Sequence, residues 1–153
     1  MIVVGADSDA IKKEIKELNV EVVENPGWHE GIASSLRCGL TAVQKMKPVT
    51  DGIIFMVCDQ PYVTTSLLDG LLRAQHETGL PLVSSNYEGT LGTPALFHQS
   101  FFAELMILKG DTGARKILAK HPDEVAGISF PKGVIDIDTD AQYESLKRNK
   151  RSP

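Results

Sequence analysis

The 153-residue chain lacks three features that would point to particular classes of protein. It has only two cysteines, Cys38 and Cys58, and neither has disulfide-framework or metal-ligand spacing. Its longest apolar stretch, Gly52 to Cys58, is far shorter than the ~20 residues that cross a bilayer. Its 16 basic and 20 acidic side chains give a net charge of −4, and basic residues cluster only from Lys147 to Arg151. We therefore expect a cytoplasmic protein with no membrane or nucleic-acid partner, because phosphate backbones need a basic face.

What is present fits one ordinary globular domain. Apolar residues make up 42% of the chain and charged residues 24%, which is enough to form a real core at this length. We find no internal repeat, no low-complexity stretch and no linker that would divide the chain. The sequence predicts a single domain over residues 1–153.

Short apolar runs alternate with helical patterns along the chain, and this alternation predicts a parallel α/β sheet. The expected strands are Ile2–Val4, Val20–Val23, Ile53–Val57, Leu82–Ser84, Thr93–Phe97, Val125–Ser129 and Val134–Ile137. The expected helices are residues 8–18, 31–45 and 65–78, with His98–Leu108, Thr112–Lys120 and Asp140–Lys147.

The first candidate for chemistry is Asp59, which directly follows the most hydrophobic expected strand, Ile53–Val57. Such a strand is covered on both faces, so Asp59 is expected at the carboxyl edge of the sheet, where open α/β sheets bind ligands. A carboxylate there can hold Mg²⁺ while the metal bridges substrate phosphates. The alternative is an Asx turn, or a cap for the helix that starts near Thr65.

Two further segments are candidates. Asp136 and Asp138 are two residues apart, so they share a face if a strand runs through both, and one of them can then lie beside Asp59. Alternatively, Asp138 or Thr139 is an N-cap for the helix that follows. In Asn25–Leu40 a turn of small residues opens a helix, whose amides and Ser34 and Ser35 hydroxyls could line a base, ribose or phosphate pocket. The alternative there is close helix packing, with Trp28 filling core or interface.

Taken together, these segments resemble the MobA-like nucleotidyltransferase family, particularly its molybdenum cofactor cytidylyltransferase branch, over nearly the whole chain. The motifs that carry the resemblance are, in family order, Asn25-Pro26 with Trp28, Gly31, Ser34-Ser35 and Gly39-Leu40; Val57–Pro61; Gly92–Phe97; Leu108–Arg115; and Asp136–Thr139. Each motif is weak alone, but the ordered set is specific.

The resemblance implies a three-layer, Rossmann-like, mostly parallel sheet of the nucleotide-diphospho-sugar transferase type. It also implies Mg²⁺-dependent transfer of a nucleoside monophosphate from CTP or GTP to a phosphorylated acceptor, typically the pterin cofactor, with release of pyrophosphate. Asp59 and Asp138 would be the catalytic residues and metal ligands. The other roles implied are nucleotide binding by Gly31, Ser34, Ser35 and Asp59, and acceptor binding by Gly92, Thr93, Pro94, Gly110, Asp111 and Arg115.

The chain departs from the family pattern at two places. The family opens with a strand and a glycine-rich loop, Leu-Ala-Ala-Gly with a following Arg and Lys, whereas here Met1 is followed at once by the family's second strand. One βα unit is therefore expected to be missing, which would leave two strand edges unpaired and catalysis by this chain alone very weak or absent. Thr93 stands where the pterin-using branch often has His, which puts the acceptor in doubt.

Two other functions are compatible with the sequence. The chain could be a non-catalytic binding or assembly module derived from this family, acting with a partner or as a homo-oligomer. The run from Asp136 to Thr139 also matches the nucleophile motif of haloacid-dehalogenase-type phosphatases, but only fifteen residues follow Asp138, too few for the rest of such a fold.

Overall fold

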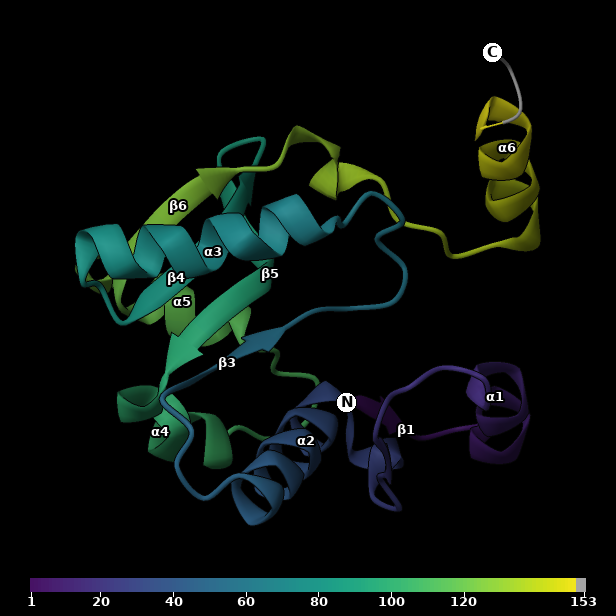
Figure 1. Cartoon of the computed structure of the whole chain (residues 1–153), viewed down its shortest axis with the longest axis horizontal. Helices are drawn as coiled ribbons and strands as arrows, with labels where there is room; N and C mark the ends of the chain where they lie inside the picture. Colours follow the sequence, from purple (N-terminus) through teal and green to yellow (C-terminus); the bar gives the residue numbers. More distant parts are fainter. Residues whose placement is uncertain (151–153) are drawn as a thin grey trace.

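The computed structural model describes residues 1–150, so Arg151 of the basic tail and the end of the expected domain lie outside the described part (Figure 1). Its strands are β1 (Ile2–Val4), β2 (Val22–Glu24), β3 (Gly52–Phe55), β4 (Leu82–Tyr87), β5 (Thr90–His98) and β6 (Val125–Ser129). Its α-helices are α1 (Ser8–Ile15), α2 (Ile32–Met46), α3 (Thr65–Thr78), α4 (Phe102–Met106), α5 (Arg115–Lys120) and α6 (Asp140–Lys150). Short 3₁₀ turns are η1 (Trp28–Glu30), η2 (Gln99–Phe101), η3 (Pro122–Glu124) and η4 (Pro131–Val134).

The larger sheet has the strand order β3-β5-β4-β6. β3, β4 and β6 run in one direction, and β5 runs antiparallel to both of its neighbours. The reversal comes from the two-residue turn Glu88-Gly89, whose φ angles of 52° and 75° are the left-handed pair that a tight hairpin requires. The mostly parallel α/β sheet expected from the sequence is thus confirmed, with β5 as its antiparallel member.

Helices cover both faces of this sheet and make three layers. Alternate residues of β5 enter opposite cores: Phe97 packs with α2, α4 and α5, while Leu96 packs with Leu71 of α3. This two-residue alternation is what a strand covered on both faces requires. Figure 1 shows α3 lying across one face of the strands.

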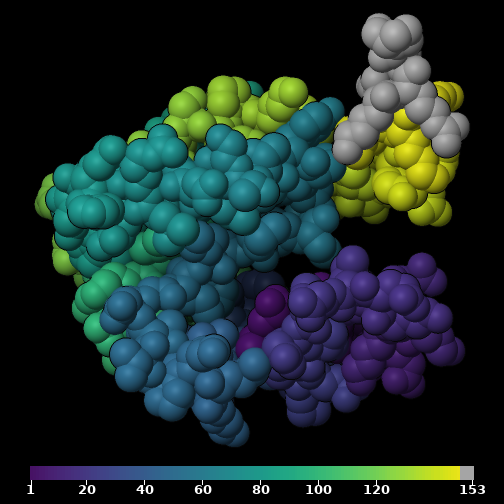
Figure 2. Space-filling model, in the orientation of Figure 1, coloured from purple at the N-terminus to yellow at the C-terminus, as the bar shows by residue number. Residues whose placement is uncertain are grey.

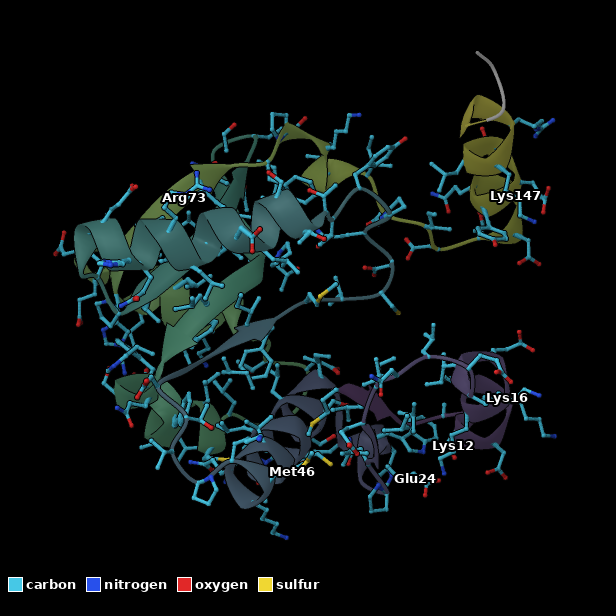
Figure 3. The ribbon with its side chains drawn as sticks, in the orientation of Figure 1. Lys12, Lys16, Glu24, Met46, Arg73 and Lys147 are labelled. Atoms are coloured by element: carbon cyan, nitrogen blue, oxygen red, sulfur yellow. The ribbon has the colours of Figure 1, made fainter. Side chains whose placement is uncertain are left out.

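The first two strands form a separate parallel sheet, β1-β2. Within the described residues, β1 is paired only with β2, and β3 only with β5. Helix α2 packs against β1 and β2 and also contributes to the core that includes Phe55 of β3. Figure 2 shows a hollow between the N-terminal residues and the main body. α1 is tied to β2 by the Lys12–Glu24 ion pair, with Nζ and Oε1 3.0 Å apart (Figure 3).

The prediction of a strand at Val134–Ile137 was wrong. The chain instead makes the turn η4 and then continues without regular structure to α6. At this turn Gly133 packs so closely against the rings of Phe130 and the distant Tyr87 that no Cβ would fit there. Among the described residues, no helix is both long and apolar enough to cross a membrane.

Candidate active site

A cavity of about 460 Å³ opens beyond the end of β3. Four parts of the fold surround it: the loop after β3, the β4–β5 hairpin, the start of α5 and the segment from η4 onward. The lining residues are Val57, Asp59, Gln60, Tyr87, Glu88, Thr90, Arg115, Gly133, Val134 and Asp136. This position matches the rule that open α/β sheets bind ligands outside the carboxyl ends of their strands.

Asp59 lines the cavity, and one of its carboxylate oxygens has no hydrogen-bond partner among the described residues. This oxygen, Oδ1, is buried. Leaving a buried carboxylate oxygen unpaired is costly, by about 1–3 kcal/mol or more. A bound cation would remove that cost, and carboxylate oxygen is the ligand that Mg²⁺ and Mn²⁺ prefer. Asp59 would therefore supply one ligand to a divalent metal, although no three His, Cys, Asp or Glu side chains are grouped as a metal site within residues 1–150.

The charges that line the cavity are mainly negative. Asp59, Glu88 and Asp136 are carboxylates, and Arg115 is the single cation among the lining residues. An anionic substrate would be repelled by this set alone. A divalent cation would reverse the local balance and make the cavity suitable for phosphate.

Of the two aspartates near the C-terminus, the structure brings Asp136 into the cavity, while Asp138 is not among its lining residues. Asp138 is exposed beside the start of α6, where its own amide donates to Oε1 of Gln142 at 3.0 Å. Thr139 accepts from the Gln142 amide at 3.3 Å, so the capping alternative for this stretch is realised by Thr139.

The hydroxyls of Ser34 and Ser35 are held by Asn25. The Asn25 amide nitrogen donates to both, at 2.8 and 3.1 Å, and the Ser34 hydroxyl donates to the carbonyl of Gly31 at 2.9 Å. Ser34 is only 5% exposed. These contacts fix the entry to α2, and neither serine lines the cavity at Asp59.

Gly31 and Gly110 meet in the structure. The Gly110 carbonyl accepts from the Ala33 amide at 3.1 Å, and the Gly110 amide donates to Glu30 at 3.4 Å. Glu30 also pairs with Arg37 at 2.6 Å. The hydrogen bond from Arg37, followed by that from Gly110, holds the pKa of the Glu30 carboxyl below its usual value. Arg37 is thus engaged in structure.

Asp111 adjoins the same point, with its carboxylate against Gly31, and is exposed. Neither Gly31, Gly110 nor Asp111 lines the cavity, whereas Arg115, five residues beyond Gly110, does. The residues assigned by sequence to opposite sides of the site are therefore partly in contact, away from Asp59.

The expected acceptor strand lies behind the cavity wall. The carbonyls of Gly92 and Pro94 accept from the hydroxyls of Ser84 and Ser85, each at 2.8 Å, which fixes β5 against β4. The Thr93 hydroxyl points the other way and donates to Oε1 of Gln60 at 3.3 Å. Of Gly92, Thr93 and Pro94, only Thr93 is hydrogen-bonded to the loop that carries Asp59.

Sequence reasoning missed the hairpin wall of the cavity, formed by Tyr87, Glu88 and Thr90. The signal was the Glu88-Gly89 pair, which lies between the expected strands Leu82–Ser84 and Thr93–Phe97. A second hollow, of about 1100 Å³, lies where β1 meets α1. It includes Gly5, Asp7 and Trp28, and the Trp28 side chain is 49% exposed instead of filling the core.

An open α/β sheet with a cavity outside the carboxyl ends of its strands is typical of the class of α/β proteins that bind nucleotides and other phosphate-bearing ligands. Residues 1–125 match the model of the MobA-like NTP transferase domain. The chain belongs to this family, and its fold is the nucleotide-diphospho-sugar transferase type expected from the sequence.

The chain is also similar in sequence to a protein of Bacillus subtilis. The purine catabolism protein PucB of Bacillus subtilis (strain 168) is 27% identical over 122 residues, covering 78% of this chain and 57% of PucB. The chain thus spans little more than half of that relative.

Solved structures are also similar. The homologue of Mycobacterium tuberculosis Rv0371c from Mycobacterium sp. strain JC1 has 26% identity and a TM-score of 0.76, covering 96% of this chain and 72% of that one. Rv0371c of M. tuberculosis, solved in complex with manganese, has 25% identity and a TM-score of 0.73, covering 94% and 74%.

Proposed function

We propose that this chain is a Mg²⁺-dependent nucleotidyltransferase that moves a nucleoside monophosphate from CTP or GTP to a small phosphorylated acceptor such as the molybdenum pterin cofactor. Membership of the MobA-like NTP transferase family supports nucleotidyl transfer. The acidic cavity at the sheet edge supports a metal-dependent reaction, and the manganese in Rv0371c shows that a similar protein takes a divalent ion.

The observation that carries the proposal is the unpaired, buried Oδ1 of Asp59. We assign Asp59 as the main metal ligand. The second carboxylate comes from the segment after η4, where Asp136 lines the cavity and Asp138 is the residue matched by resemblance. A bound Mg²⁺ would neutralise phosphate charge and orient the triphosphate for displacement.

The reaction needs positioning more than a strong base. An acceptor phosphate oxygen attacks the α-phosphorus of the nucleotide, a new P–O bond forms, and the bond to the bridging oxygen breaks to release pyrophosphate. We assign Arg115, which lines the cavity, to stabilise the negative charge that develops there. In this proposal the acceptor lies toward β5, with Gly92, Thr93 and Pro94 on that side. Gly31, Ser34 and Ser35 shape the nucleotide side, and Gly110 and Asp111, expected on the acceptor side, support the site through their contact with Gly31.

The test is the variant Asp59→Ala. We expect its Mn²⁺ affinity, measured by isothermal titration, to fall by about a hundredfold, since a direct ligand is lost. Pyrophosphate release from CTP or GTP with acceptor should fall in parallel. Asp51→Ala is the matched control, because Asp51 is an exposed aspartate at the opposite end of the same strand. Equal Mn²⁺ binding by Asp59→Ala and the parent would refute the assignment.

The alternative is a non-catalytic binding or assembly module. Its support is the shortage of cations, because Arg37 is committed to Glu30 and only Arg115 lines the cavity. A chain that binds Mn²⁺ but releases no pyrophosphate with any acceptor tried would favour this module. Release at an ordinary enzymatic rate would reject it.

A further inference from the structure

Gln60 is almost fully buried, at 8% exposure, and both ends of its side-chain amide are used. Its Nε2 donates to the carbonyl of Gly133 at 3.0 Å. Its Oε1 accepts from the Thr93 hydroxyl at 3.3 Å. One side chain next to Asp59 therefore connects the loop after β3 to β5 and to the turn η4.

These contacts have a consequence for Asp136. Besides the Gln60–Gly133 bond, the carbonyl of Asp59 accepts from the amide of Ile137 at 2.9 Å. The Asp59-Gln60 pair is thus bonded to the other segment at two points, one on each side of Asp136. Two such bonds fix how far the Asp136 backbone lies from that of Asp59.

The Gly133 end of the bridge is itself rigid. Gly133 lies against the rings of Tyr87 and Phe130, and its amide donates to the Phe130 carbonyl at 2.8 Å. The Gly133 carbonyl is therefore a fixed acceptor.

We infer that Gln60 is a positioning residue of the metal site: its side-chain amide holds the Asp59 and Asp136 carboxylates in a common cavity and links this pair to Thr93 of β5. The inference rests on the proposed function, since it assumes that Asp59 binds a metal. Hydrogen bonds that orient metal ligands are typically worth about 10–100-fold in metal affinity.

The side chain needed here must donate at one end and accept at the other. Methionine has a similar length and shape but makes neither bond, so Gln60→Met removes the bridge with little change in volume. Thr93→Val removes only the second bond, at a half-buried position. Comparing the two variants separates the loss of both Gln60 hydrogen bonds from the loss of the Thr93 bond alone.

The experiment measures Mn²⁺ affinity by isothermal titration, well below the melting temperature of each variant. Gln60→Met should bind Mn²⁺ about tenfold or more weakly than the parent, and Thr93→Val should show a smaller decrease of about two- to threefold. Gln44→Met is the matched control: Gln44 is exposed on α2, far from the cavity lining, and its variant should bind Mn²⁺ like the parent.

A purely structural role would lower the melting temperature and leave Mn²⁺ affinity of the folded protein unchanged. That result for Gln60→Met overturns the inference while the proposed function stands. If the parent itself binds no Mn²⁺, the proposed function fails, and the inference with it. If Gln60→Met does not fold, Thr93→Val decides, because unchanged Mn²⁺ affinity in that variant rejects the bridge.

Discussion

Asp136 and Asp138 compete for the place beside Asp59. Asp136 lines the cavity, whereas Asp138 is exposed next to the first turn of α6. We expect Asp136→Asn to weaken Mn²⁺ binding about tenfold or more, because a neutral amide is a poorer ligand than a carboxylate. Asp138→Asn should leave Mn²⁺ affinity within about twofold, losing only a favourable charge near a helix N-terminus. Isothermal titration of both variants measures the difference.

The reverse order of effects would return the metal role to Asp138 and require this segment to rearrange on metal binding. Sequence alone could not separate the two residues. Their spacing places them on one face only in a strand, and here both lie after η4 in a segment without regular structure. Asp59 was easier to find, because the apolar run marks the end of its strand. The expectation that this strand is fully covered was wrong, since β3 is an edge strand of the described sheet and its residues are half-buried or exposed.

Gly31 is the residue on which the join between α2 and the loop before α5 depends. Its φ of 111° favours glycine, and a Cβ there would lie 2.6 Å from the Gly110 carbonyl carbon. We expect Gly31→Ala to lower the free energy of unfolding by about 2 kcal/mol or more, through strain and overlap together. Chemical denaturation measures this loss.

Gly27→Ala is the control for the same turn, because φ there is −91° and the nearest atom to a new Cβ is 3.5 Å away. Its unfolding free energy should change by less than about 1 kcal/mol. Equal losses for the two variants would mean that the Gly31–Gly110 contact is not a structural constraint.

Most elements were predictable because each has its own local period. β1, β6 and α3 have the predicted bounds, and α2 differs from prediction by one residue at each end. The antiparallel course of β5 depends on the short turn Glu88-Gly89, which a pattern of alternating strands and helices does not reveal. The turn η4 depends on Tyr87 packing against Gly133, a contact between distant residues.

At the scale of the whole molecule, two sheets share one helix. α2 contacts β1 and β2 and supports the core beneath β3, so the small sheet and the large one lie on the same layer. Neither β1 nor β3 carries the lysine or proline that commonly protects a free strand edge. The resemblance implies unpaired strand edges, and the structure shows which peptide groups lie along those edges.

Hydrogen-bond alternation identifies these groups and gives a prediction. In β1, Ile2 and Val4 form hydrogen bonds with β2, so the amide of Val3 between them points away from β2. Beside β5, the carbonyl of Asp51 accepts a hydrogen bond from Gln99, and every second residue after Asp51 bonds in the same direction. The amide of Ile54 therefore points away from β5. We expect the Val3 and Ile54 amides to exchange with solvent about a hundredfold faster than those of Val4 and Phe55, because no strand covers them. Site-resolved hydrogen exchange in dilute protein measures this. Slow exchange at both amides would show that the two sheets join in solution or that another strand pairs with their edges.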